Sequence, residues 1–449
     1  MRMPDLSQFP TALEKASFLL ETAAEVEHAL MVQYLYAVYS LRASSDFTDA
    51  AQRQAISRWR MDVLGIAKEE MGHLLSVQNL LLSIGLAPNL EREDFPPRHE
   101  LYPFLLHLEP LSRRSLAKYV FAESPPKVPA GAEAAFVEIE QLLQLENVSV
   151  NHVGVIYTLL GVVFSGAADL PTLIGQETDP GRKTYLQAVA ELRSLLVPAG
   201  QEAAWLLEPA AFGNPLGRQA EAFDWSASDS PSGGNIRVFK VTNGASAMLS
   251  LSDIAAQGEG PGGTTEGDAH FARFFRIFAG QPPFPAPEDT WQPSRPVAID
   301  PLLPGQEGAP ERIISHPLAA GFARAANAGY AVLLALIEHY LLTNRADRDI
   351  FATSAIEGEM LTRLAGARKE LAALPRTAEG ADQASLPFHM PATLHLPTEE
   401  VARGEALRER YRAGLIVFGD LRQLLAAAGK PTDSVDRWIE DYTRDLAAV

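Results

Sequence analysis

A glutamate and a histidine lie three positions apart, as Glu70 and His73, within the stretch Met61–Leu81. That stretch contains no proline, and its apolar residues recur every three or four positions, which predicts a helix. Both residues fall on the apolar stripe, where an unpaired polar group would cost several kcal/mol. The spacing Glu-x-x-His projects both side chains toward one point, as in helical bundles that bind iron or manganese. Adjacent Glu69 lies about 100° away around the helix, so we expect it to be dispensable.

A second inward carboxylate lies in residues 12–41, which the same periodicity predicts to be a helix. Glu27 shares its apolar stripe with Leu30 and Tyr34. It could be a metal ligand, or a carboxylate that an arginine or tyrosine of a neighbouring helix satisfies. The short connection around Asp46–Asp49 predicts that this helix and the next are antiparallel neighbours.

A third long helix is expected over about Glu133–Phe164, after a short helix that ends at Glu123 before Ser124-Pro125. His152 is the one ionisable group on the later stripe of the long helix. A single histidine on an apolar face is commonly a core residue with satisfied hydrogen bonds, so both this role and a ligand role stay open. His99 and His107 are expected to be structural.

The stretch 257–280 holds Glu259, Glu266 and His270 among several glycines. Glycines allow the backbone to bend, so a loop could interrupt what is in effect one helix bearing a glutamate and a histidine. The alternative is an ordinary loop followed by an amphipathic helix. Just before this region, the alternating run Asn235–Asn243 predicts a short strand.

Composition excludes several classes of protein. The 449 residues include no cysteine, so disulfides, thiol catalysis and thiolate metal sites are excluded. The net charge of −18 argues against nucleic acid and anionic membranes as partners. No apolar run approaches the ~20 residues of a membrane span, and the first residues do not resemble a signal peptide. We therefore expect a cytoplasmic protein without a membrane or nucleic-acid partner.

The remainder of the chain predicts more helices between long loops. Residues 85–110 and 280–317 are rich in proline and lack periodicity, whereas residues 318–342, 350–374 and 399–448 predict helices. Glu338 and His339 are adjacent and point about 100° apart, so they cannot chelate as a pair. Glu357 and Glu359 are interpreted as surface charges. The sequence thus predicts an all-α fold.

Four motifs occur in order: EVEHALMVQYLYAVYSL, AKEEMGHLLSVQNLLLSIG, SLAKYVFAESP and AAQGEG followed by DAHFARFFRI. In this order they resemble the ferritin-like domain of the iminophenyl-pyruvate dimer synthases of bisindole pathways. The resemblance covers about residues 12–280. It implies a ferritin-like four-helix bundle over residues 1–280, and a C-terminal helical extension over residues 281–449 that packs on the bundle.

The resemblance also implies a ligand set. Glu27 would be the first ligand, Glu70 and His73 the second group, and His270 with Glu259 or Glu266 the fourth. Tyr34 and Tyr157 are the candidate catalytic side chains.

The third group departs from the family's pattern. Members commonly have Gly-Glu-x-Tyr there, whereas this chain has Gly154-Val155-Ile156-Tyr157. Three alternatives follow: His152 substitutes for the missing carboxylate, the site holds one metal ion, or the site is vestigial. Because a di-iron site usually has about four carboxylates, we expect about one metal ion per chain, or a weakly held second.

By resemblance, the protein would be an iron enzyme with one or two ions, with manganese as an alternative metal. Its substrate would be a small amino or imino acid, or an aromatic intermediate of secondary metabolism, which is oxidised or coupled with O₂. A homo-oligomer is compatible with this hypothesis. The alternative is a non-enzymatic metal-binding or scaffold protein with a vestigial ferritin-like site. Metal content and O₂ consumption would distinguish the two.

Overall fold

The computed structural model describes residues 5–95, 106–125, 127–145, 152–225, 236–258, 265–392 and 394–448. Within these ranges the regular elements are all helices, accompanied by a few isolated β-bridges. The predicted all-α fold is confirmed.

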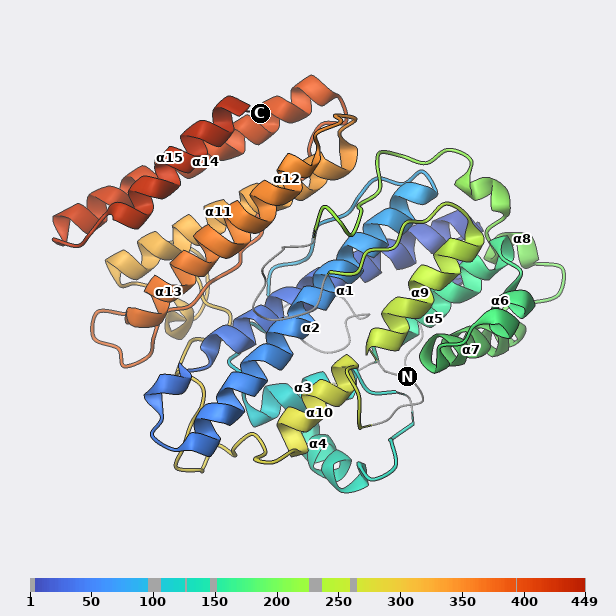
Figure 1. Cartoon of the computed structure of the whole chain (residues 1–449), viewed down its shortest axis with the longest axis horizontal. Helices are drawn as coiled ribbons and strands as arrows, with labels where there is room; N and C mark the ends of the chain where they lie inside the picture. The colour runs from blue at the N-terminus through green and yellow to red at the C-terminus, as the bar shows by residue number, and fades with distance from the viewer. Residues whose placement is uncertain are drawn as a thin grey trace.

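Two long antiparallel helices form the centre of the molecule (Figure 1). They are α1 (Ala12–Ser40) and α2 (Ala50–Ser83). Thr11 and Glu14 form a capping box that begins α1, and the Asp49 side chain accepts a hydrogen bond from Gln52 N to begin α2. Each helix is buried over most of its length, so the pair provides a rigid base for inward-pointing polar side chains.

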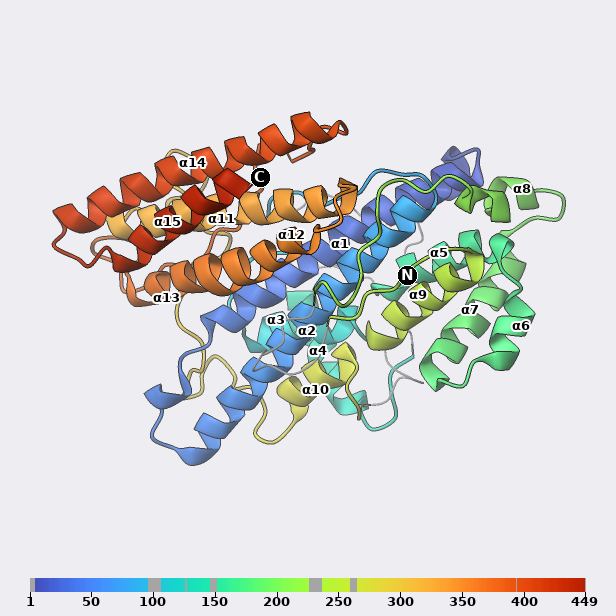
Figure 2. The same cartoon turned by 45° about the horizontal axis from the view of Figure 1, so that its top comes forward.

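Two interrupted helices complete the bundle. The helix α3 (Arg113–Ala122) ends where α5 (Gly154–Phe164) begins, since Val153 N donates to Ala122 O at 3.1 Å. In the same way α9 (Gly244–Gly258) and α10 (His270–Ala279) lie end to end in both views (Figures 1 and 2). Helix α3 packs on α10, and α5 packs on α9. The sequence hypothesis of a loop that interrupts one helix before His270 agrees with this arrangement.

The predicted long helix over residues 133–164 is wrong. Helix α4 (Glu133–Leu145) is separate from α5 and packs against α3, not in line with α5. The short helix that was expected to end at Glu123 is instead the first half of the third bundle helix. Hydrophobic periodicity detects each helical segment but contains no information about which segments lie in line.

The predicted strand over residues 235–243 is also wrong, because residues 236–243 have no partner strand. Side chains bind their backbone instead: Asn79 Nδ2 donates to Phe239 O at 2.8 Å, and Phe239 N donates to Ser76 Oγ at 3.3 Å. The segment passes so close to α2 that a Cβ at Gly72 would lie 2.5 Å from Arg237 O. Its alternating pattern reflects a chain lying across a helix.

The other helices surround this bundle. Helix α7 packs on α5 and α9, and α11 packs on α14 and on the π-helical segment. The helices are α6 (Leu170–Gln176), α7 (Pro180–Leu196), α8 (Glu202–Trp205), α11 (Pro317–Leu342), α12 (Asp349–Thr353), the π-helical segment (Ser354–Leu364), α13 (Ala365–Ala373), α14 (Glu400–Ala427) and α15 (Asp433–Ala448).

The C-terminal helices lie on the opposite side of α1 and α2 from α9 and α10 (Figure 2). His28 of α1 is hydrogen-bonded to the hydroxyl of Tyr330 on α11, and the buried apolar residues of both parts form one continuous cluster. The division at residues 280 and 281 stays a prediction. The interpretation of Glu359 as a surface charge is wrong, since it is 1% exposed and lies 3.0 Å from Arg363.

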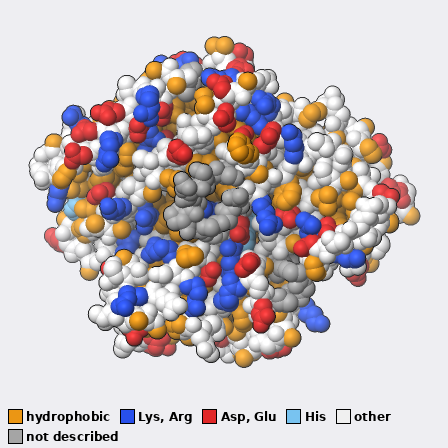
Figure 3. Space-filling view, viewed as in Figure 1, with side chains coloured by type: hydrophobic (Ala, Val, Ile, Leu, Met, Phe, Trp, Pro, Cys, Tyr) orange, Lys and Arg blue, Asp and Glu red, His pale blue; other side chains and the backbone are white. Residues whose placement is uncertain are grey.

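Among the described helices, α11 is long and apolar enough to cross a membrane. The pair of α5 and α6 also passes this test if the two helices, which are bent by 112° relative to each other, are counted as one span. In α11, 78% of the apolar window is buried inside the protein, as in the core helix of a bundle. Over the face drawn in Figure 3, basic and acidic side chains are interspersed, so the net charge of −18 is not concentrated there.

Candidate metal centre

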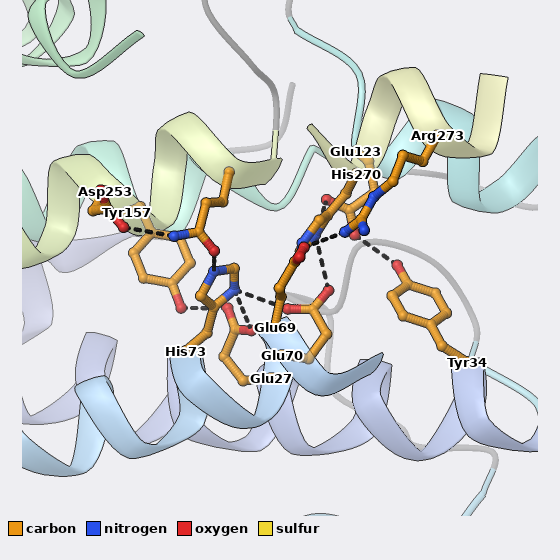
Figure 4. Close-up of polar contacts among 11 residues, drawn as sticks. Glu27, Tyr34, Glu69, Glu70, His73, Glu123, Tyr157, Asp253, His270 and Arg273 are labelled. Carbon is orange, nitrogen blue, oxygen red and sulfur yellow. Dashed lines mark hydrogen bonds and ion pairs between the residues drawn. The ribbon is translucent and has the colours of Figure 1, made fainter. Parts of the chain in front are cut away.

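Five buried side chains from four helical elements converge between the two halves of the bundle (Figure 4). They are Glu27 of α1, Glu70 and His73 of α2, Glu123 at the end of α3, and His270 at the start of α10. Their atoms make two groups that could each hold a metal ion, Glu27–Glu70–His73 and Glu70–Glu123–His270. Within each group the ligand atoms lie within 4.8 Å of one another, and Glu70 belongs to both.

The two oxygens of Glu70 face different histidines. Its Oε2 lies 2.9 Å from His73 Nδ1, and its Oε1 lies 3.2 Å from His270 Nδ1. His73 Nδ1 is also 3.4 Å from Glu27 Oε2, and His270 Nδ1 is 3.7 Å from Glu123 Oε2. This is the arrangement expected of a carboxylate that bridges two metal ions, each with one histidine and one further carboxylate.

The outer nitrogen of each histidine has its own partner. His73 Nε2 lies 3.1 Å from Gln257 Oε1, and Gln257 Nε2 donates to Asp253 Oδ2 at 2.5 Å. His270 Nε2 lies 3.0 Å from Glu69 Oε2, which also binds Arg273. Such partners fix the tautomer and ring orientation of metal-binding histidines, leaving Nδ1 free to face the ion.

The expectation that Glu69 is dispensable does not fit this geometry. Glu69 lies on a different side of α2 from Glu70, as its position in the helix requires. That side is covered by α10, however, so Glu69 contacts His270 and Arg273 and its side chain is only 28% exposed. The sequence gives the direction of the side chain but not the helix that lies over it.

Two tyrosines donate hydrogen bonds to the outer carboxylates. Tyr157 OH donates to Glu27 Oε1, and Tyr34 OH donates to Glu123 Oε1 at 2.6 Å. Burial, together with these carboxylates, raises the pKa of both hydroxyls well above 10, so both remain protonated donors. The structure therefore makes Tyr34 and Tyr157 positioning residues for two ligands, and their catalytic role stays a prediction.

Burial and neighbouring charges both shift the pKa values of the cluster, and at the two histidines the neighbouring groups outweigh burial. Burial and the charge of Glu70 raise the pKa of Glu27 to about 8. Burial alone would lower the pKa of His73, but hydrogen bonds to Glu27 and Glu70 outweigh it and raise this pKa to about 10. The pKa of His270 is likewise raised, against burial, by Glu70, Glu123 and Glu69. The raised pKa values of both histidines favour their protonated forms beside these carboxyl groups.

The donor set fits a pair of divalent cations. Three carboxyl groups buried together can all be ionised only with positive charge nearby, since isolated buried ions are very costly. Glu27 Oε2 and Glu70 Oε1 accept no well-directed hydrogen bond from the described residues. Carboxylate and imidazole donors suit iron and manganese. The cavity between them offers about 20 Å³ to the centre of a water-sized sphere, enough for ions and water.

Four of the sequence-predicted ligands are brought together: Glu27, Glu70, His73 and His270. His152 is not among them, because its ring stacks on Phe121 and its Nδ1 lies 3.4 Å from Ser124 Oγ. Burial lowers its pKa, as for a partly buried neutral imidazole. The hypothesis that His152 substitutes for a missing carboxylate is therefore not supported.

The remaining positions that the sequence analysis singled out do not join the five clustered side chains in the described structure. Glu266 is exposed and belongs to neither ligand group, while Glu259 lies outside the described residues. Val155, which was expected to occupy the place of an inward glutamate, is half-buried and does not line the cavity, whereas Gly154 and Tyr157 do.

Sequence analysis missed Glu123 as a ligand. It is 3% exposed and supplies the carboxylate that was expected on the predicted third helix. The available signal was its place at the end of the apolar motif SLAKYVFAESP, directly before Ser124-Pro125. The sequence predicts only a short helix that ends at Glu123, whereas that helix is half of an interrupted bundle helix.

Comparison with known proteins agrees with this arrangement of helices and ligands. Residues 20–201 match the family model described as Ferritin-like. The chain contains a ferritin-like domain. The match includes most of α1 and all of α2, α3 and α5, and therefore three of the four elements that carry the candidate ligands.

Two curated proteins are similar to this chain. It is 31% identical over 139 residues to the 2-imino-3-(indol-3-yl)propanoate dimerase of Chromobacterium violaceum, covering 25% of this chain and 13% of the relative. It is 23% identical over 354 residues to the dichlorochromopyrrolate synthase of Lentzea aerocolonigenes, covering 72% of this chain and 30% of the relative. The chain thus spans less than a third of the length of either relative. No solved structure gives a significant match.

Proposed function

We propose that this protein is a metal-dependent enzyme that oxidises or couples a small amino or imino acid, or an aromatic intermediate of secondary metabolism. The observation that supports this most directly is the pair of ligand groups sharing Glu70. When bound, two iron ions, or manganese ions, would supply the redox chemistry with O₂. The named relatives support the substrate class, although each is a much longer protein.

The protein's own residues would orient and isolate the reacting atoms. Glu70, His73 and Glu27 would hold one ion, and Glu70, His270 and Glu123 would hold the other. Tyr157 and Tyr34 keep the outer carboxylates in place by donating to the oxygens that do not face the histidines. All five of these residues are at most 4% exposed, so the surrounding helices would exclude bulk water from the site.

Glu70→Gln is the sharpest test of the metal site because it alters both groups. Protein purified aerobically without chelator should contain about two metal ions per chain, and the variant should lose most of both, with unchanged far-UV circular dichroism. Glu140→Gln, an exposed change on α4, is the matched control. Equal metal content in wild type and Glu70→Gln would refute the assignment.

Enzymatic activity requires a separate measurement. Aromatic 2-imino acids, generated in place by an amino-acid oxidase with catalase, would be offered to metal-loaded protein and the products followed by mass spectrometry. Product that forms with the wild-type protein, but neither without protein nor with the Glu70→Gln variant, supports the proposal of an enzyme. Bound metal without any turnover or O₂ consumption favours the alternative, a metal-binding scaffold, because fold alone does not determine function.

A further inference from the structure

Four arginines gather where α1 ends, on the side of the molecule that faces the C-terminal helices. They are Arg42 after α1, Arg60 of α2, Arg295 in the segment before α11, and Arg368 of α13. Their charges act on one another: burial, and after it the charges of Arg368, Arg60 and Arg42, lower the pKa of Arg295 to about 10. Such mutual repulsion is unfavourable unless an anion compensates it.

Two of these arginines, Arg295 and Arg368, line a small cavity. It offers about 10 Å³ to the centre of a water-sized sphere, which is near the size needed for one water or one small anionic oxygen. Its polar wall consists of Tyr36, Tyr39, Ser40, Arg295, Arg368 and Ser385. The Tyr36 hydroxyl donates to Ala298 O and the Ser40 hydroxyl donates to Ala37 O, so an anion here would depend on the guanidinium groups. Guanidinium groups bind carboxylates and phosphates in proteins.

No carboxylate in the described part of the chain forms an ion pair with any of the four arginines. This is unexpected in a protein with 56 acidic and 38 basic residues, where acidic partners are abundant. Arg42 Nε is buried without a hydrogen-bond partner, and the guanidinium of Arg368 contacts the Tyr39 ring at 5.0 Å.

Capping of α1 explains only part of this group. Arg60 Nη2 donates to the carbonyls of Leu41 and Arg42, each at 2.9 Å, and Arg295 Nη2 donates to Tyr39 O at 2.7 Å. Cations at a helix C-terminus are favourable for this reason. Within the described residues, however, the guanidinium groups of Arg42 and Arg368 donate no hydrogen bond to α1, so capping leaves them unexplained.

We propose that this cavity receives one oxygen of a small oxyanion, a carboxylate or a phosphate group, between Arg295 and Arg368. The site is distinct from the metal centre, because Tyr36 follows Glu27 by nine residues, about 13 Å along the axis of α1 and on its opposite face. The anion would connect the end of α1 to α13. It would thereby stabilise the contact between the bundle and the C-terminal helices.

Calorimetric titration of the full chain with inorganic phosphate, and separately with acetate, tests the site in low-salt, chloride-containing buffer. We expect saturable binding of at least one of the two, and the preferred anion identifies the source of the oxyanion. Arg368→Gln should weaken this binding by about tenfold or more, as expected for loss of a charged hydrogen-bond donor. Lys369→Gln removes the same charge from the next, exposed position of α13 and should leave binding unchanged.

The outcomes decide the proposal. Failure of wild-type protein to bind either anion overturns it, and so does equal weakening by the two variants, which would indicate a general charge effect. Arg368→Lys keeps the charge but loses the planar fork, so it should bind more weakly than wild type and more tightly than Arg368→Gln. It also provides the test if Arg368→Gln does not fold. Metal content should be the same in all variants, which separates this site from the proposed function.

Discussion

Among the individual residues, Glu123 changes the expected metal stoichiometry most. Without it, the described cluster would hold two carboxylates, Glu27 and Glu70, and one metal ion would be the reasonable expectation. With it, each histidine has a carboxylate of its own in addition to the shared Glu70. The sequence argument for a single ion rested on the absence of a glutamate at Val155, and the structure supplies that carboxylate from a different helix.

We therefore predict that Glu123→Gln lowers the metal content from about two ions per chain to about one. A glutamine can still accept the hydrogen bond from Tyr34, so the fold should be preserved. The measurement is elemental analysis of both proteins after gel filtration. His152→Ala is the comparison, because His152 lies outside both ligand groups, and metal loss in this variant but not in Glu123→Gln would contradict the assignment.

Glu69 gives a second prediction at this scale. Its carboxylate holds the outer nitrogen of His270, and loss of such a partner commonly weakens metal binding by about 10- to 100-fold. Glu69→Gln should lower metal affinity by about tenfold in chelator competition, with the total number of sites unchanged at saturating metal. If the metal affinity of Glu69→Gln equals that of the Glu140→Gln control, Glu69 is dispensable for metal binding.

Sequence reasoning located Glu27, Glu70, His73 and His270 because each can be placed on an apolar helical stripe or at its start. It could not find Glu123 or the role of Glu69 for one common reason. Both depend on which helices are neighbours, Glu123 through the alignment of α3 with α5 and Glu69 through the position of α10. Periodicity fixes a direction within a helix and does not fix what lies opposite.

At the scale of elements, the site depends on how α5 is held. Tyr185 of α7 donates to Tyr157 O at 2.7 Å, and α5 and α7 approach closely at Gly161. A Cβ at Gly161 would lie 2.4 Å from Val189 Cγ2 and 2.5 Å from the Tyr185 hydroxyl. Helix α5 cannot move away without shifting Tyr157, which positions Glu27.

Gly161→Ala should thus destabilise the protein by about 1–3 kcal/mol, although alanine is the better helix former by ~1 kcal/mol. Chemical denaturation would measure the change. Gly419→Ala is the matched control, since a Cβ at that position of α14 meets nothing within 4 Å, and it should be neutral or stabilising. Equal effects of the two changes would show that the close approach of α5 and α7 is not tight in solution.

Helix α11 carries a buried glutamate that should make stability depend on pH. Burial raises the pKa of Glu338 from 4.5 to about 7, although Leu396 N donates to its Oε1 at 3.1 Å. A raised pKa means that the folded state binds the proton more tightly. The stability contributed by this group is present in full below about pH 4.5 and is lost as the pH rises to about 7.

Glu338→Gln removes this titration. We expect the variant to be more stable than wild type at pH 8 by about 1–3 kcal/mol, and about equal to it near pH 4.5. Urea unfolding at both pH values gives the comparison. A variant that is less stable than wild type at pH 8 would mean that the ionised carboxylate is favourable, through Arg403 or Arg410.

At the scale of the whole molecule, the C-terminal helices share one apolar core with the ferritin-like bundle. The sequence predicts these helices because their periodicity is long and regular, but the division of the chain at residue 280 came from the resemblance alone. Contacts such as His28 with Tyr330 join α1 to α11 across that division. If this shared apolar core makes folding cooperative, residues 1–280 and residues 281–449 should unfold together.

Metal binding provides the test, because a ligand that binds the folded state alone stabilises whatever unfolds with its site. At a free metal concentration of 100 times the dissociation constant, the gain is about 2.7 kcal/mol per site. We expect wild-type protein to show a single calorimetric transition that moves to higher temperature as a whole when Fe(II), under nitrogen, or Mn(II) is added. Glu70→Gln should show the same single transition without the shift, because both groups share this ligand. Two transitions, of which only one responds to metal, would instead mean that residues 281–449 fold independently of the bundle.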